Sequence, residues 1–261
     1  MTECKSQQLE SCVGEVLPDG TCLGGGGNDP GYPYPGGGGE DPQPEPYDPC
    51  EKMKAQNTNA NYKAKIKELD KPAILKLRNE TGYSENKNGT FTELSNAAST
   101  DASDAMILSI SPSTKGYIHT HQNDYPTGNY NDNGDPEIRQ TIKMFSPADV
   151  EGLMTMAGFV TNGDYSELYG TMISSYGNYT IKFTGTAEDI KTGFDTKKWR
   201  DAYIDYRKEY SDWSFERLFL TFLKDKMDLQ GVELYKIKDN GTIQKKTLNS
   251  NNKVDSNDCP Q

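Results

Sequence analysis

The sequence predicts an α+β fold, in which a mixed, mostly antiparallel β-sheet is flanked by helices and preceded by a disordered Gly/Pro-rich segment. Stretches with strand-like alternation of apolar and polar residues occur among stretches with the apolar spacing i, i+3, i+4, i+7 of amphipathic helices. Asn-Gly pairs at 88–89 and 240–241 separate neighbouring alternating stretches, as is typical of hairpin turns. Residues 23–48 are rich in Gly and Pro, a composition that favours a flexible linker.

The composition divides the chain into three expected segments. Residues 1–48 form a flexible segment and linker rich in Cys, Gly and Pro, residues 49–250 form the folded domain, and residues 251–261 form a short polar tail. The sequence leaves open whether Cys50 and Cys259 form a disulfide, whether the first three cysteines pair among themselves, or whether the thiols are free. The five cysteines are Cys4, Cys12, Cys22, Cys50 and Cys259.

The charge of the chain excludes some classes of partner. The net charge is −11, and such an acidic surface repels phosphates, so we expect no nucleic acid and no anionic lipid surface as a main partner. The chain contains no apolar run of 18 residues, and we therefore expect no membrane span. The first residues, MTECKSQQLESC, lack the apolar region of a signal peptide.

The first half of the domain is predicted to contain one helix followed by four strands. The helix covers residues 48–69, which carry a sparse apolar stripe, and Pro72 ends it. A loop rich in Asn, Asp and Gly is expected at 122–137. The strands are predicted from alternation and from the first Asn-Gly turn, at 74–85, 90–95, 104–112 and 114–122.

The second half begins with the clearest helix signal of the chain, at 146–160. Ser146 is a typical N-cap residue, Pro147 occupies the first helical position, and Asp149 stands three residues past the cap, as in a capping box. Alternation and amphipathic spacing predict the elements that follow. These are strands at 167–175 and 178–185, helices at 197–210 and 213–228, and a hairpin at 231–249.

Both histidines of the chain, His119 and His121, lie in the strand predicted at 114–122. Successive strand residues point to opposite faces, so these two side chains share one face and can bind the same metal ion. Zinc accepts imidazole nitrogens, and a catalytic zinc site usually has three protein ligands and one open position. The alternative interpretation is a pair of exposed histidines on a strand.

Asp149 is the best candidate for a third ligand. Its position in the SPAD stretch also fits a purely structural role, because an acidic residue in the first turn stabilises a helix. The two roles are compatible, since the helix start can hold the backbone while the carboxylate faces the metal.

These residues resemble the motif of the JAMM (MPN-plus, or JAB1/Mov34-type) zinc metallopeptidases, which consists of an upstream Glu, then H-[ST]-H, then S-x-x-D. The resemblance covers about residues 75–160, with Glu80 in NETGYSE, His119 and His121 in IHTH, and Ser146 and Asp149 in FSPADV. It implies a core of the JAMM or cytidine-deaminase type. The later stretches YGTMISSYGNYTIKF and GVELYKI look like parts of bacterial secreted or envelope-associated proteins that carry this domain.

The resemblance implies one Zn²⁺ per chain, held by His119, His121 and Asp149, and hydrolysis of an amide bond in a peptide or protein substrate by a metal-activated water. Glu80 would act as the general base and Ser146 would stabilise the oxyanion. Glu85 is the rival base. Glu80 is preferred because ETGY matches the E-x-G pattern of the family on the first strand.

The chain departs from the family pattern between the histidines and Ser146. Gln122 follows His121 where the family usually has Pro, and 24 residues separate His121 from Ser146. A long surface insertion adds little closure entropy and can act as a lid over the site. The alternatives to a peptidase are a non-catalytic binding module of the same fold and a metal-dependent toxin or effector domain delivered through the flexible N-terminal segment.

Overall fold

The computed structural model of the protein describes residues 15–16, 22–23, 47–96 and 106–260. The flexible linker expected within residues 1–48 thus falls almost entirely outside the described residues, as do Cys4 and Cys12.

The chain divides into two compact units, Met1–Pro42 and Gln43–Gln261. In the first unit, the described residues form two short antiparallel strands, β1 (Glu15–Val16) and β2 (Cys22–Leu23). The second unit contains every candidate site residue.

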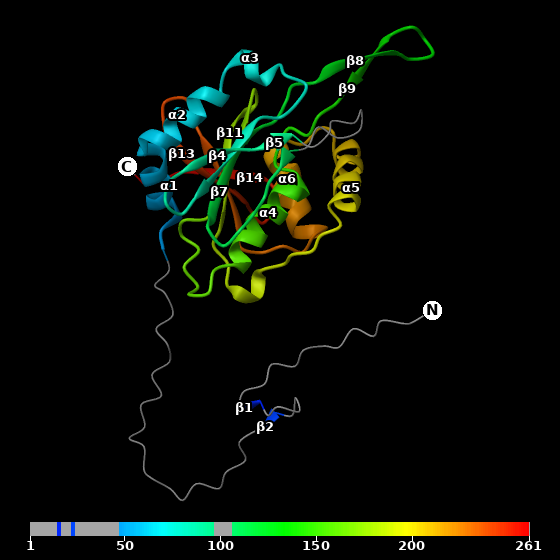
Figure 1. Cartoon of the computed structure of the whole chain (residues 1–261). Coiled ribbons are helices and arrows are strands. Elements are labelled where there is room, and N and C mark those ends of the chain that lie inside the picture. The colour runs from blue at the N-terminus through cyan, green and yellow to red at the C-terminus, as the bar shows by residue number, and fades with distance from the viewer. Residues whose placement is uncertain (1–14, 17–21, 24–46, 97–105, 261) are drawn as a thin grey trace, which may run out of the picture. The chain divides into compact units, whose positions relative to one another are not determined.

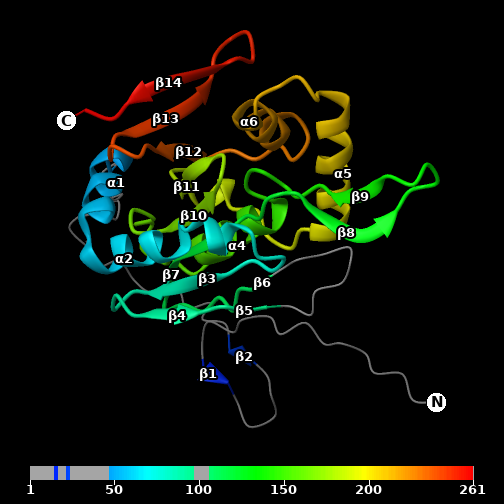
Figure 2. The ribbon, with the colours of Figure 1, turned by 90° about the horizontal axis from the view of Figure 1, so that it is seen from above.

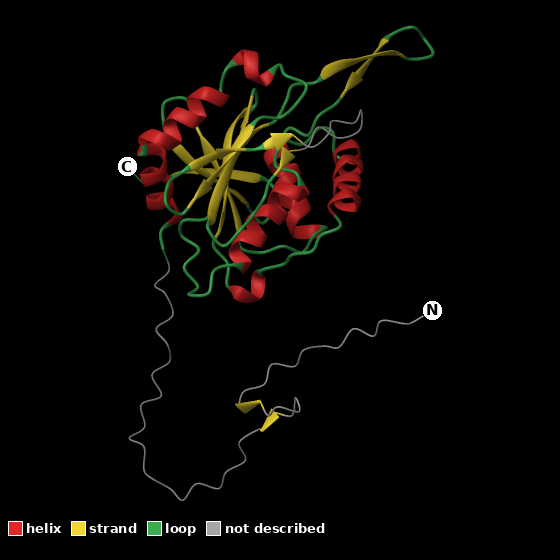
Figure 3. Ribbon diagram, viewed as in Figure 1, coloured by secondary structure: helices red, strands yellow, loops and turns green. Residues whose placement is uncertain are grey.

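Eight strands of the second unit form one sheet, namely β3 (Gly82–Asn86), β4 (Phe91–Glu93), β7 (Thr114–Thr120), β10 (Tyr169–Ser174), β11 (Gly177–Phe183), β12 (Val232–Ile237), β13 (Ile243–Leu248) and β14 (Val254–Asp258). Their order is β14-β13-β12-β11-β10-β7-β3-β4 (Figure 1). Within this sheet, β7 and β10 run parallel and the other neighbours are antiparallel. The predicted α+β fold with a mixed, mostly antiparallel sheet is confirmed (Figure 3).

Six α-helices of the described residues flank this sheet: α1 (Pro49–Thr58), α2 (Ala60–Leu69), α3 (Pro72–Leu75), α4 (Pro147–Gly158), α5 (Thr196–Glu209) and α6 (Phe215–Asp225). A 3-10 helix, η1 (Ala187–Asp189), precedes α5. Helices α4, α5 and α6 cover one face of the sheet, and α1, α2 and α3 cover the other (Figure 2). Because strand side chains alternate between faces, Tyr117 packs in the core under α4–α6, whereas Ile118 packs in the core under α2.

The single helix predicted at 48–69 is wrong, because Asn59 divides it into α1 and α2. Asn59 has φ −63° and ψ 123°, outside the helical region. Its side-chain oxygen accepts hydrogen bonds from the backbone N–H groups of Asn61 (2.9 Å) and Tyr62 (3.1 Å). The short polar side chain thus caps α2, and the backbone of Asn59 itself leaves the helical conformation. Pro72 occupies the first turn of α3 and so begins a helix as well as ending the previous one.

Three of the predicted strands are shorter than expected. Of the stretch 90–95, only Phe91–Glu93 enter the main sheet, as β4. Of the stretch 74–85, the residues before Gly82 form α3 and a turn, and only the end enters the sheet as β3. Of the stretch 104–112, the described part contains β6 (Met106–Ile107), which pairs with β5 (Ser95–Asn96) in a separate two-stranded sheet. The strand predicted at 114–122 is confirmed as β7.

The loop predicted at 122–137 is wrong, because most of it forms a hairpin of β8 (Tyr125–Tyr130) and β9 (Pro136–Arg139) that projects from the second unit (Figure 1). At the tip, the Asn131 side chain accepts the backbone N–H groups of Asn133 (3.0 Å) and Asp135 (2.9 Å). Both strands are mostly exposed, so no buried apolar face reveals them in the sequence.

The elements predicted between 146 and 249 are confirmed. Beyond them, β14 pairs with β13 and lies in the residues expected to form a polar tail. Next to β14, Cys259 forms a disulfide with Cys50 of α1, with Cα atoms 5.5 Å apart, which confirms one of the pairings that the sequence left open. Among the described helices, none is long and apolar enough to cross a membrane.

Candidate metal centre

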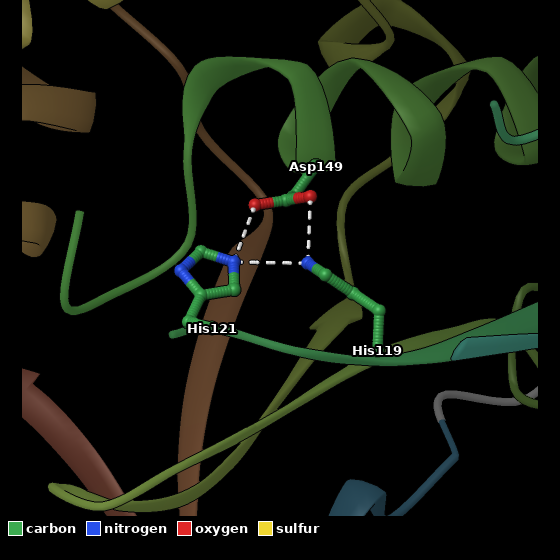
Figure 4. Close-up of side chains that lie close together, drawn as sticks. All are labelled: His119, His121 and Asp149. Carbon is green, nitrogen blue, oxygen red and sulfur yellow. Dashed lines mark hydrogen bonds and ion pairs between the residues drawn. The ribbon is translucent and has the colours of Figure 1, made fainter. Parts of the chain in front are cut away.

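His119 and His121 project from the same face of the sheet towards α4 (Figure 4). His119 lies within β7, and His121 continues the course of the strand, because its backbone N–H donates to the carbonyl of Ile173 (2.9 Å). Both histidines are only 4% exposed. The predicted same-face arrangement is confirmed, and the alternative interpretation of an exposed pair is wrong.

Asp149 reaches these histidines while it also caps α4. The backbone N–H of Ser146 donates to Asp149 Oδ2 (2.6 Å), and the backbone N–H of Asp149 donates to Ser146 Oγ (3.3 Å), which completes a capping box. The cap fixes the Asp149 side chain in one orientation. The structural role and the placement as a candidate ligand are therefore both present in one residue.

The possible ligand atoms of the three side chains face one another (Figure 4). His119 Nε2 lies 2.9 Å from His121 Nε2 and 3.2 Å from Asp149 Oδ1, and His121 Nε2 lies 3.5 Å from Asp149 Oδ2. Ligand atoms that bind a tetrahedral zinc ion at 2.0–2.1 Å lie about 3.3 Å from one another. The spacing of these atoms matches that value, so His119, His121 and Asp149 could hold one metal ion.

The protonation of His121 also suits metal binding. Its Nδ1 lies 3.0 Å from the backbone carbonyl of Ile142, an acceptor, so this nitrogen carries the proton and donates it. In the neutral ring, Nε2 then has a free lone pair and faces the other two side chains. Such a hydrogen bond to the outer nitrogen is the usual companion of a metal-binding histidine.

The Asp149 carboxylate is held in its ionised form. Burial by itself raises the pKa of this carboxyl group, but the electrostatic and hydrogen-bonding interactions with His119 and His121 outweigh burial and hold the pKa well below its usual range. An ionised carboxylate can bind a cation without first losing a proton.

Two further residues of the sheet position these side chains. Tyr117 donates a hydrogen bond from its hydroxyl to the backbone carbonyl of Asp149 (2.7 Å) and so ties β7 to the first turn of α4. Gly82 pairs with His119 across β3 and β7, and a Cβ at this position would lie 2.4 Å from the Ile118 carbonyl oxygen and 2.7 Å from His119 Cβ. A side chain at residue 82 would therefore displace the His119 backbone.

The three side chains line a cavity of about 560 Å³ on the α4 side of the sheet. Glu80 and Ser146, the other two residues of the predicted site, line the same cavity. Its lining includes the apolar residues Leu94, Met106, Leu108 and Ile110, whereas Arg139 and Arg200 add positive charge. The structure thus brings together all five residues that the sequence motif nominates.

Glu85, the rival base, is absent from the residues lining this cavity and faces the other side of the sheet. It is buried, and its Oε2 accepts a hydrogen bond from the Tyr169 hydroxyl (2.5 Å) while its Oε1 lies 3.1 Å from Lys115 Nζ. Gly82 pairs with His119, and Glu85 is three residues further along β3. Because strand side chains alternate between faces, the Glu85 side chain points away from the histidines.

The insertion after His121 supports the site. Gln122, where the JAMM pattern has Pro, is buried and donates a hydrogen bond from its side chain to the Arg78 carbonyl (2.9 Å). Thr141 and Lys143 both contact Asp124, with Lys143 Nζ 2.6 Å from its carboxylate, so the base of the hairpin is closed. This closure holds Ile142, whose carbonyl orients His121.

Sequence reasoning did not identify Tyr117 and Ile142 as parts of the site. Tyr117 carries a usable signal, because it precedes His119 by two residues and therefore shares its face of the strand. Ile142 carries none, since it contributes a backbone carbonyl that any residue type supplies.

Comparisons of the chain with protein-family models, with curated proteins and with solved structures find no match. The function therefore has to be inferred from the geometry of the site and from the sequence motif.

Proposed function

We propose that this protein is a zinc-dependent peptidase or isopeptidase, which hydrolyses amide bonds in a peptide or protein substrate. The observation that carries the proposal is the convergence of His119, His121 and Asp149 in a cavity that Glu80 and Ser146 also line. The order of these five residues, and the spacing within H-x-H and within S-x-x-D, resemble the JAMM motif, which supports the same conclusion.

Zinc suits these side chains better than calcium or magnesium does. Two imidazole nitrogens and one carboxylate are ligands that zinc prefers, whereas calcium and magnesium bind mainly oxygen. Three protein ligands leave one position for water or substrate. When bound, zinc lowers the pKa of a bound water towards 7 and polarises the scissile carbonyl. His119, His121 and Asp149 would hold the ion.

Glu80 is the proposed general base. It precedes β3, the strand that pairs with β7 beside His119, and its side chain lines the cavity with the histidines. In this position the carboxylate accepts the proton of the attacking water and passes it to the leaving amine. Glu85, the glutamate within β3, cannot take this role, because it faces the opposite core.

Ser146 is the proposed donor to the developing oxyanion. Its Oγ accepts the backbone N–H of Asp149, and a hydroxyl that accepts one hydrogen bond keeps its own proton for donation. The capping box holds this hydroxyl at the start of α4, next to the metal ligands. A fixed donor of this kind stabilises negative charge on the substrate carbonyl oxygen without reorganisation.

The walls of the cavity support a peptide substrate. The apolar lining residues Leu94, Met106, Leu108 and Ile110 can bury an apolar side chain next to the scissile bond. Arg139 and Arg200 also line the cavity, and their positive charge favours a substrate with a carboxylate near the scissile bond.

The proposal is tested by measuring zinc and amide hydrolysis on the same preparations. Elemental analysis of the purified protein should find about one zinc per chain, and His119→Ala should lose it. Glu80→Gln should keep its zinc and lose at least about a hundredfold in cleavage of a peptide library, read as new termini by mass spectrometry. Glu188→Gln, an exposed carboxylate outside the cavity, is the matched control and should change neither quantity.

Unchanged zinc content in His119→Ala would contradict the assigned ligands. Stoichiometric zinc without cleavage of peptides or isopeptides by the native chain would contradict the catalytic part and indicate a non-catalytic binding module instead.

A further inference from the structure

A second cavity lies on the opposite face of the sheet from the metal centre, between the sheet and helices α1 and α2. Its volume is about 230 Å³, and none of its lining residues lines the cavity at the metal centre. Gln56 lines it from α1, Tyr62 from α2, Glu85 from β3, Tyr169 from β10 and Lys182 from β11. The proposed peptidase reaction uses none of them.

The charged side chains of this cavity leave one positive charge in excess. Lys52, Lys115 and Lys182 face two glutamates, Glu85 and Glu167. Both carboxylates already have cationic partners, because Lys115 Nζ lies 3.1 Å from Glu85 Oε1 and Lys52 Nζ lies 2.8 Å from Glu167 Oε1. Among the described residues, no carboxylate lies within ion-pair distance of Lys182, although the charge of Glu167 acts on it from further away. This excess stands out in a chain whose net charge is −11.

Lys182 is also the most deeply buried of the three lysines. It is 1% exposed, and among the described residues its ammonium makes one hydrogen bond, to the Ser166 carbonyl (2.8 Å), although it has three N–H groups to donate. Burial lowers its pKa to about 8. A buried ammonium with donors to spare is costly unless a negatively charged acceptor accompanies it.

Gln56 supplies a second buried polar group with unused hydrogen-bonding capacity. Its amide lies against the Tyr169 hydroxyl and acts to lower the pKa of that group, yet within the described part of the chain neither amide atom has a partner in good hydrogen-bond geometry, and both atoms are buried. Buried amides are normally satisfied, so such a group calls for a ligand or an ordered water. Water alone would satisfy the hydrogen bonds but would leave the charge of Lys182 unbalanced.

We propose that this cavity binds a compact oxyanion, a phosphate or a small carboxylate, with Lys182 as the charged donor and the Gln56 amide as a second donor. The space suits this ligand, because one water occupies about 30 Å³ and the cavity therefore holds an ion of a few heavy atoms, not a peptide. The site does not depend on the metal centre, since the sheet separates the two.

The test is a calorimetric titration of the native chain with inorganic phosphate and, separately, with acetate, at an ionic strength kept constant with sodium chloride. One anion should bind per chain. Lys182→Met, which preserves the bulk and removes the charge, should weaken binding roughly tenfold to a hundredfold. Tighter binding of phosphate would identify a phosphate as the ligand, and tighter binding of acetate a carboxylate, and both results support the site.

Three variants make the result decisive. Lys197→Met removes the same charge from an exposed lysine that pairs with Asp201, and it should bind the anion like the native chain. Gln56→Leu should also weaken binding, which keeps the test valid if Lys182→Met does not fold. His119→Ala should leave binding unchanged. The proposal would be overturned if the native chain shows no saturable binding, or if Lys182→Met and Gln56→Leu both bind the anion as tightly as the native chain. Loss of binding in His119→Ala would also overturn it.

Discussion

The hydroxyl of Tyr117 donates a hydrogen bond to the backbone carbonyl of Asp149 at 2.7 Å, and it thereby connects the strand that carries both histidines to the helix that carries the carboxylate. The ring of Tyr117 lies over Gly170 of the neighbouring strand, where a Cβ would come within 2.2 Å of the Tyr117 hydroxyl oxygen. The Tyr117 hydrogen bond therefore sets the separation between β7 and the first turn of α4, and the absence of a side chain at Gly170 leaves room for the ring.

Tyr117→Phe should weaken metal binding while it keeps the fold. The variant retains the packed ring and removes one hydrogen bond, which lowers the free energy of unfolding by about 1 kcal/mol. Because the Asp149 backbone loses its support, metal affinity should fall about tenfold. Tyr179→Phe is the matched control, since the Tyr179 hydroxyl donates a hydrogen bond to Glu216, away from the site. Competition with a chelator measures the affinity, and equal values for the two variants would refute the positioning role of Tyr117.

Gly82→Ala should reduce metal affinity more strongly than it reduces stability. The added Cβ would lie 2.4 Å from the Ile118 carbonyl oxygen, so β7 must shift at His119. Gly158→Ala at the end of α4 is the control, because a Cβ there meets no atom within 4 Å. Zinc content and thermal unfolding should be measured on both. A Gly82→Ala protein with native zinc affinity would show that the close approach of β3 does not position His119.

Glu80→Gln and Glu85→Gln should have opposite consequences. Glu80→Gln should abolish the proposed hydrolysis and leave stability nearly unchanged, because Glu80 is only partly buried. Glu85→Gln leaves Lys115 without its carboxylate in a mostly buried setting and should cost about 1–3 kcal/mol of stability without loss of activity. Chemical denaturation and peptide cleavage distinguish the two, and loss of activity in a folded Glu85→Gln protein would reverse the assignment of the base.

The stability of the protein should rise between pH 8 and pH 10 through Lys182. Burial lowers the pKa of this lysine from 10.5 to about 8; the negative charge of Glu167 opposes this shift, and the positive charges of Lys52 and Lys115 add to it. In this window the unfolded chain keeps the proton that the folded chain has released, so the free energy of unfolding increases with pH. Relative to Lys182→Met, the native chain should gain on the order of 2–3 kcal/mol from pH 8 to pH 10. Denaturation curves at several pH values test this, and parallel pH profiles for the two proteins would contradict it.

Much of the fold could be predicted from local patterns. The Asn-Gly hairpins, the amphipathic helices α5 and α6 and the capped start of α4 all follow from neighbouring residues, and all are confirmed. The failures also have local causes. Asn59 caps a helix inside a stretch with helical composition, and the exposed β8–β9 hairpin has no apolar alternation to reveal it.

The sequence by itself determined which side chains could act together at the candidate metal centre. Alternation on a strand places His119 and His121 on one face, and a helix cap presents Asp149 in the first turn, because both patterns depend only on backbone geometry over a few residues. Tertiary structure decided which groups surround them. It placed Glu80 in their cavity and Glu85 in the opposite core, and it brought the Ile142 carbonyl and the Tyr117 hydroxyl to the ligands. These contacts depend on which strands pair and in which register, and pairing between distant segments is set by the packing of the whole core.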